Sequence, residues 1–217
     1  MKKLLSAALT AVLLVSLLPL VSCSPSYEGF TYKDGAIVSD DGEKTFHPTP
    51  IGFQPCGIGE KCAVFDEAID LFTVLDLEGN PLDTGDWMTE EYAGSASVVY
   101  YRDGIVIPPV DEIDFNVCYV CNEGNTVISV ATITDPEIID TLIDTAVSGR
   151  SDALFIENEI AEYTIKFHSD AFPGLFYSVT YAVCKDGHYI VDAGNDTVAE
   201  IGDILEKYVS VNGVPAN

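Results

Sequence analysis

A recurrent turn sequence constrains the fold of this chain more than any other feature. A basic residue followed by Asp-Gly stands between apolar runs at residues 33–35, 102–104 and 185–187. Asp-Gly suits the positive φ angles of a two-residue hairpin turn, whose twist matches that of the flanking antiparallel strands. Glu-Gly-Asn at residues 78–80 and 123–125 indicates two further turns. These turns predict an antiparallel sheet that is built largely as a meander.

Residues 126–209 carry the most regular pattern. Alternating apolar and polar residues predict a strand at 126–134 and three more strands at 161–168, 175–184 and 188–192. Alternation of this kind is typical of a strand with one buried face and one solvated face.

Two amphipathic helices are predicted in the same part of the chain. Asp135 is a good N-cap, Pro136 suits the first helical position, and Gly149 ends the apolar stripe that follows. A second apolar stripe begins near Asp196 and continues to Tyr208 at helical spacing. We therefore expect an α+β fold, in which both helices pack on one face of an antiparallel meander sheet in the order strand, helix, three strands, helix.

The part of the chain before residue 126 is less regular. The sequence predicts hairpins at 27–38 and 97–107, a loop-like region at 39–62 and a short helix from Asp86 to Tyr92. No low-complexity linker separates this part from the rest. We therefore expect one domain over residues 28–212, with a sub-boundary near 110–125 as the alternative.

The N-terminal segment indicates where the protein is located. Two lysines precede an apolar run over residues 4–21, which is the pattern of a secretory signal. Leu20-Val21-Ser22-Cys23 resembles the lipobox of bacterial lipoproteins. The resemblance implies that residues 1–22 are removed, that the Cys23 thiol carries diacylglycerol, and that residues 23–27 form a short lipidated tether. An ordinary cleaved signal or an uncleaved anchor is the alternative.

The whole chain resembles the small lipoproteins of Gram-positive, clostridial-type bacteria. The lipobox carries most of this resemblance, which also rests on Trp-Met-Thr-Glu-Glu-Tyr at 87–92 and on the layout of 126–209. It implies an extracytoplasmic domain that acyl chains at Cys23 hold to the lipid bilayer of the cell membrane, and it brings no active site. In a Gram-negative envelope, Ser24 would permit delivery to the outer membrane.

The charge of the chain excludes one class of partner. The sequence has 35 acidic residues and 10 lysines and arginines, a formal net charge of −25, and loss of Lys2 and Lys3 with the signal makes this −27. Nucleic-acid binding needs a basic footprint, and the sequence has none. We therefore expect no nucleic-acid partner.

Five cysteines follow Cys23, an odd number for an exported protein. Cys56 and Cys62 are the best candidates for a disulfide, because Gly57 and Gly59 make the backbone between them flexible enough to close. Two free thiols are the alternative. Cys118 and Cys121 have the spacing of a redox pair, but a strand places residues three apart on opposite faces.

Metal sites have only weak support in the sequence. Acidic residues cluster in one predicted hairpin without the spacing of an EF-hand loop, so a weak calcium site stands against a solvated acidic turn. The candidate calcium ligands are Asp76, Glu78, Asp83 and Asp86. Cys184 and His188 lie close enough for zinc, but no second pair of ligands accompanies them. No cofactor is predicted.

Catalytic motifs do not stand out. The sequence has no His-Glu-x-x-His, Gly-x-Ser-x-Gly or Ser-x-x-Lys motif and no glycine-rich phosphate loop. The function we expect is therefore a non-catalytic binding or interaction module that meets a protein partner at the cell envelope. The alternatives are an envelope hydrolase or metal-dependent enzyme, and an immunity-like or inhibitor lipoprotein whose acidic surface blocks a basic toxin or enzyme.

Overall fold

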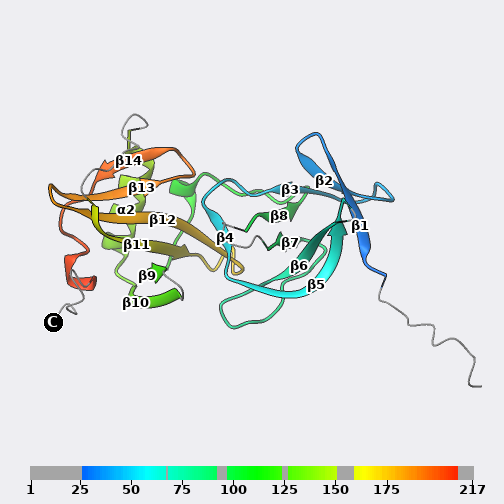
Figure 1. The fold of residues 1–217 in the computed structure, drawn as a ribbon, viewed down its shortest axis with the longest axis horizontal. Helices are drawn as coiled ribbons and strands as arrows, with labels where there is room; N and C mark the ends of the chain where they lie inside the picture. The colour runs from blue at the N-terminus through cyan, green and yellow to red at the C-terminus, as the bar shows by residue number, and fades with distance from the viewer. Residues whose placement is uncertain (1–25, 67, 92–96, 124–126, 151–158, 210–217) are drawn as a thin grey trace, which may run out of the picture.

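The chain folds into two β-sheets that lie side by side along the long axis of the molecule (Figure 1). A computed structural model describes residues 26–66, 68–91, 97–123, 127–150 and 159–209. The first sheet takes its strands from residues 28–102, and the second takes all but one of its strands from residues 117–200.

The first sheet is a closed barrel. Its order is β1-β2-β3-β8-β7-β6-β5, and all neighbours are antiparallel except β1 and β5, whose parallel pairing from Glu28↔Ala63 to Phe30↔Phe65 closes the ring. Its strands are β1 (Glu28–Lys33), β2 (Ala36–Ser39), β3 (Thr45–Pro48), β5 (Gly57–Phe65), β6 (Ile69–Leu75), β7 (Trp87–Glu90) and β8 (Val99–Arg102). Phe30, Ile37, Phe46, Leu71 and Met88 fill its interior.

The second sheet is antiparallel, with the order β10-β9-β11-β12-β13-β14. These strands are β9 (Val117–Glu123), β10 (Val127–Ile133), β11 (Glu159–His168), β12 (Leu175–Cys184), β13 (His188–Asp192) and β14 (Thr197–Glu200). Helix α2 (Pro136–Ser148) packs against the sheet. One 3-10 turn, η1 (Val110–Glu112), precedes the strands of this sheet in the chain, and another, η2 (Glu206–Tyr208), follows them.

Helix α2 begins and ends where the sequence predicts. The Asp135 carboxylate accepts a hydrogen bond from the Glu137 amide at 3.1 Å, Pro136 occupies the first turn, and Gly149 is the C-cap. Its buried face carries Ile138, Ile139, Leu142, Ile143 and Ala146. The strands predicted at 161–168, 175–184 and 188–192 are confirmed as β11, β12 and β13, and the hairpin at 27–38 is confirmed as β1 and β2.

The predicted α+β class with two packed helices is wrong. The described residues are mostly strand and contain α2 as their single α-helix. The stripe that begins near Asp196 is β14, which pairs with β13, followed by the short turn η2. Asp196 and Gly202 have positive φ angles of 56° and 71°, which an α-helix does not allow. Leu205 and Val209 are nevertheless buried, so the apolar residues of the stripe serve the core without a helix.

Three predictions for the first half are also wrong. The segment after Asp86 is strand β7, because the barrel interior takes alternate side chains such as Met88; Tyr92 lies outside the described residues. The region 39–62 contains β3, β4 and most of β5. Strand β8 ends at Arg102 and pairs with β3 and β7, so residues 97–107 form no hairpin.

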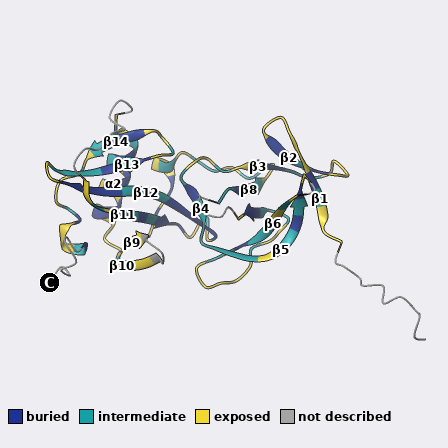
Figure 2. Ribbon diagram, in the orientation of Figure 1, coloured by how far each residue is buried: buried dark blue, intermediate teal, exposed yellow. Residues whose placement is uncertain are grey.

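One strand joins the two sheets. β4 (Phe53–Pro55) stands between barrel strands β3 and β5 in the sequence, yet it pairs with the start of β12, from Leu175↔Pro55 to Tyr177↔Phe53. Phe53, Val74 and Val99 accordingly belong to the same apolar core as the residues between α2 and the second sheet. Figure 2 shows buried residues in both sheets and in β4. The junction is therefore a packed interface.

Candidate functional site

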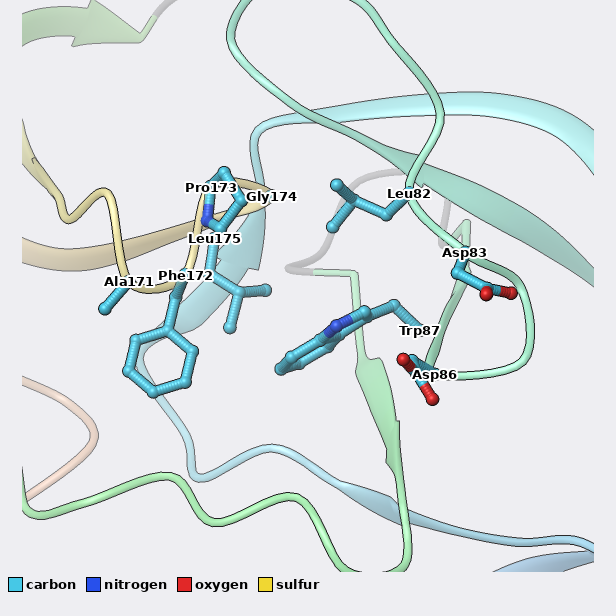
Figure 3. Close-up of a pocket in the computed structure, with 9 residues that line it drawn as sticks. All are labelled: Leu82, Asp83, Asp86, Trp87, Ala171, Phe172, Pro173, Gly174 and Leu175. Carbon is cyan, nitrogen blue, oxygen red and sulfur yellow. The ribbon is translucent and has the colours of Figure 1, made fainter.

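A cavity of about 160 Å³ lies where the barrel meets the second sheet. One wall is the loop from Leu82 to Trp87, which leads into β7. The other wall is the segment from Ala171 to Leu175, which leads into β12 (Figure 3). Each wall thus comes from a different sheet, and the pairing of β4 with β12 holds them together.

Aromatic and aliphatic side chains form most of the cavity. The rings of Trp87 and Phe172 meet edge to face, with centroids 6.5 Å apart and an interplanar angle of 80°. Leu82 and Leu175 extend toward the same space (Figure 3). Trp87 and Phe172 are only partly buried, so both keep surface that a ligand could cover. Aromatic rings of this kind provide large apolar area for recognition.

A glycine allows the two walls to approach. A Cβ atom on Gly174 would lie 2.3 Å from Leu82 Cδ1 and 2.8 Å from Val74 Cγ1, which is too close for any side chain. The Gly174 carbonyl accepts a hydrogen bond from the Cys56 amide at 2.8 Å, and the Leu82 amide donates to the Val74 carbonyl at 2.8 Å. Backbone hydrogen bonds therefore fix the position of one wall at Gly174 and of the other at Leu82.

Two carboxylates belong to the same wall as Trp87: the Asp86 carboxylate lies beside the indole, and that of Asp83 points away from the Phe172 wall (Figure 3). Asp83 Oδ1 accepts a hydrogen bond from the Gly85 amide at 2.7 Å. An oxygen of Asp86 lies 3.6 Å from a guanidinium nitrogen of Arg102, and both side chains are about half exposed. An ion pair this exposed contributes little to stability, typically about 0–1 kcal/mol. The rim therefore remains available to another cation.

The structure does not bring the four candidate calcium ligands together at one place. Asp83 and Asp86 line the cavity, whereas Asp76 shapes the preceding turn by accepting hydrogen bonds from the amides of Glu78 and Asn80 at 2.9 and 2.8 Å. The hydrogen bonds from Asn80 hold the pKa of Asp76 below its usual value. Within the described ranges, no group of three or more His, Cys, Asp or Glu side chains could hold a metal ion.

The structure does not bring Cys56 and Cys62 together. Cys62 and all of the residues between the two cysteines belong to the extended strand β5, which advances about 3.3 Å per residue. Both are free thiols, and Cys62 Sγ donates to the Leu71 carbonyl at 3.5 Å. Burial raises the pKa of Cys56 to about 12 and that of Cys62 to about 11. Cys23 lies outside the described residues.

These thiols are expected to react slowly in the folded protein. Raising the pKa of Cys62 from 9.0 to about 11 lowers its thiolate fraction roughly a hundredfold at pH 8. The measurement is the rate of labelling by an aromatic disulfide reagent, with and without urea, followed by mass spectrometry of the peptides. Fast native labelling of Cys62, or recovery of a Cys56–Cys62 disulfide from the exported protein, would contradict this expectation.

Cys184 and His188 do not form a metal pair. Cys184 is buried at the end of β12. His188 Nδ1 lies 2.9 Å from both the Gly202 carbonyl oxygen and the Tyr181 hydroxyl, and Nε2 lies 3.9 Å from Glu206 Oε1. The imidazole thus ties the segment that follows β14 to the sheet.

Sequence reasoning missed half of the cavity. The sequence singles out Asp83, Asp86 and the segment from Trp87 to Tyr92, but not Phe172, which stands directly before Pro-Gly. His168 takes a polar position in the alternation over 161–168, where a solvated side chain is expected. This side chain is buried behind the segment that contains Phe172, with Nε2 3.2 Å from the Pro173 carbonyl oxygen.

Comparisons with known proteins leave the cavity to be interpreted from its own geometry. No protein-family model, no curated protein sequence and no solved structure matches this chain. No helix in the part of the chain that the structure describes is long and apolar enough to span a membrane.

Proposed function

We propose that this chain is a lipid-anchored, extracytoplasmic binding module, and that the cavity between its two sheets is the ligand site. The observation that carries the proposal is the pair of half-buried rings, Trp87 and Phe172, which face a cavity that neither sheet could form alone. Concave sites lined by apolar and aromatic groups, with a few polar groups at the edge, are the usual form of a ligand site.

The size of the cavity suits one side chain. At about 160 Å³ it is smaller than the sites of drug-sized molecules, which measure roughly 300–1,000 Å³. It is close to the engineered cavity of about 150 Å³ that accepts benzene. A group of this size on the surface of a partner protein would fill it, which supports an interaction module.

The position of the anchor is compatible with this role. The lipobox-like sequence ends at Cys23, and strand β1 begins at Glu28 on the side of the barrel away from the second sheet (Figure 1). An acylated Cys23 would hold the barrel close to the bilayer. The junction with its cavity would then lie farther from the membrane than β1, where an envelope partner can reach it.

Site-specific photo-cross-linking in bacterial cells tests this proposal. A photoreactive residue at Pro173, on the exposed part of the cavity wall, is expected to trap one defined envelope protein, whereas the same residue at Asp34 in the β1–β2 turn is not. Phe172→Ala should reduce the Pro173 adduct roughly tenfold or more, because aromatic anchors of interfaces contribute about 2 kcal/mol or more. Equal adducts from both positions, or an adduct unaffected by Phe172→Ala, would refute the proposed site.

A further inference from the structure

We infer that the ligand of this cavity is a lysine or arginine side chain presented by a partner polypeptide. The inference rests on the proposed function, and it specifies the chemistry of the group that is bound. The alkyl stem would lie against Trp87 and Phe172, and the cationic head would reach Asp83 and Asp86.

The cavity has the two surfaces that such a side chain needs. Lysine and arginine cover apolar surface with their methylene groups while the charged head stays near water. Trp87 and Phe172 supply the apolar surface, the Asp86 carboxylate lies beside the indole, and Asp83 stands at the outer edge of the same wall (Figure 3). Tryptophan also attracts cations through its ring face more strongly than the other aromatic residues do. A purely apolar ligand would leave the carboxylates unused, and an anionic ligand would be repelled by them.

The rim already attracts a cation of the same chemistry. The guanidinium of Arg102 stands 3.6 Å from Asp86, whereas Asp83 has no cationic partner among the residues that the structure describes. Because Arg102 does not line the cavity, it neutralises part of the rim without filling the apolar space. An incoming cation would therefore bind at Asp83 and compete with Arg102 for Asp86.

The charge of the whole chain favours the same class of ligand. A net charge of −25 produces a negative potential that raises the association rate of cations, and added salt reduces this effect. A polypeptide source follows from the size of the cavity. A free alkylamine that fills about 160 Å³ makes too few contacts for tight binding, whereas a peptide adds contacts outside the cavity.

Peptide titration of the full chain in detergent micelles tests the inference. Trp87 is the single tryptophan of the chain, so its fluorescence reports directly on the cavity. The probes are pentapeptides of alanine with lysine, arginine, norleucine or glutamate in the centre, together with free n-butylamine. We expect the lysine and arginine peptides to bind at least roughly tenfold more tightly than the norleucine peptide, which carries the same stem without the charge.

Variants of the rim residues distinguish an effect of their charges on binding from an effect on the stability of the fold. Asp83→Asn combined with Asp86→Asn should reduce the affinity for the lysine peptide to that for the norleucine peptide, without changing the thermal midpoint by more than a few degrees. Arg102→Gln should increase the affinity for the lysine peptide several-fold, because it removes the competing guanidinium. A purely structural role for Arg102 would instead weaken binding.

The outcomes distinguish this inference from the proposed function. Equal binding of the norleucine and lysine peptides would overturn the cationic ligand while leaving the cavity as a ligand site. Equal binding of n-butylamine and the lysine peptide would overturn the polypeptide source. If no probe changes the Trp87 fluorescence while Pro173 still gives a specific adduct, the inference alone is overturned. Failure of both experiments would overturn the proposed function as well.

Discussion

Replacement of Asp192 by alanine is expected to lower the free energy of unfolding by roughly 3 kcal/mol, since a buried donor that loses its acceptor costs about 1–3 kcal/mol and each lost hydrogen bond of a less buried donor costs about 0.5–1.5 kcal/mol. The Asp192 carboxylate is fully buried. It accepts hydrogen bonds from the Tyr177 hydroxyl, from the Gly194 amide at 2.8 Å, and from the side-chain and backbone nitrogens of Asn195 at 2.7 and 3.2 Å. Alanine would remove the acceptor from all four donors.

This network also holds the junction between the two sheets. Burial and the neighbouring Asp192 raise the pKa of Tyr177, so its hydroxyl stays protonated and donates. A Cβ atom on Gly52, whose φ is 98°, would lie 2.8 Å from the Tyr177 ring, and one on Gly194 would lie 2.3 Å from the Ile51 carbonyl oxygen. The chain just before β4 therefore packs in close contact with Tyr177 and with the segment that follows Asp192. Asp192→Ala should loosen β4 on β12 and with it the cavity.

Urea unfolding of the full chain, followed by Trp87 fluorescence, measures the effect. Asp192→Asn keeps the size and one acceptor and should lose less stability than Asp192→Ala. The matched control is Asp186→Ala in the exposed β12–β13 turn, where we expect a change within about 0.5 kcal/mol. If Asp192→Ala behaved like Asp186→Ala, the network would not stabilise the fold as argued.

The sequence predicts well those elements whose signals are local. Helix α2 follows from Asp135, Pro136 and Gly149, three residues that act on the backbone groups next to them. The β1–β2 hairpin follows from Asp34 and Gly35, which adopt the positive φ angles of 53° and 86° that the turn requires.

The closure of the barrel and the second predicted helix show why the rest could not be predicted. The parallel pairing of β1 with β5 joins residues that are 35 apart in the sequence, such as Glu28 and Ala63, and no periodicity within either strand specifies that partner. In the sequence alone, the apolar spacing from Val198 to Tyr208 fits a helix as well as it fits a strand followed by a turn. Pairing of β14 with β13 and the positive φ of Gly202 decide otherwise, and both depend on the tertiary fold.

The candidate site also combines residues that the sequence singles out with residues that only the tertiary fold brings together. Asp83 and Asp86 belong to a dense acidic stretch of the sequence, for which a weak calcium site and a solvated turn are the two alternatives; the fold directs the nearby Asp76 to the amides of its own turn. Phe172 completes the cavity from a segment more than eighty residues away in the sequence. Its position depends on the pairing of β4 with β12, which brings part of the barrel segment into the second sheet.

The second large effect is expected from Phe46→Ala in the barrel. Phe46 is fully buried and packs edge to face on Phe30, with ring centroids 5.7 Å apart. Loss of a buried phenylalanine side chain typically costs about 3–5 kcal/mol, because apolar contacts are lost and a cavity remains. We expect this loss in the free energy of unfolding of the whole chain, although Phe46 belongs to the barrel's own core.

The reason to expect one cooperative transition is the shared junction. Phe53, Val74 and Val99 come from the barrel segment but pack in the core of the second sheet, so unfolding of the barrel would expose that core. The fluorescence of Trp87, in barrel strand β7, reports on the junction where the barrel meets Phe172, and the helical circular dichroism of α2 reports on the second sheet. Both signals should shift together in Phe46→Ala and in Leu142→Ala, its counterpart in α2. If Phe46→Ala lowered the midpoint of the Trp87 signal alone, the two sheets would unfold independently, and the cavity between them could not be a rigid site.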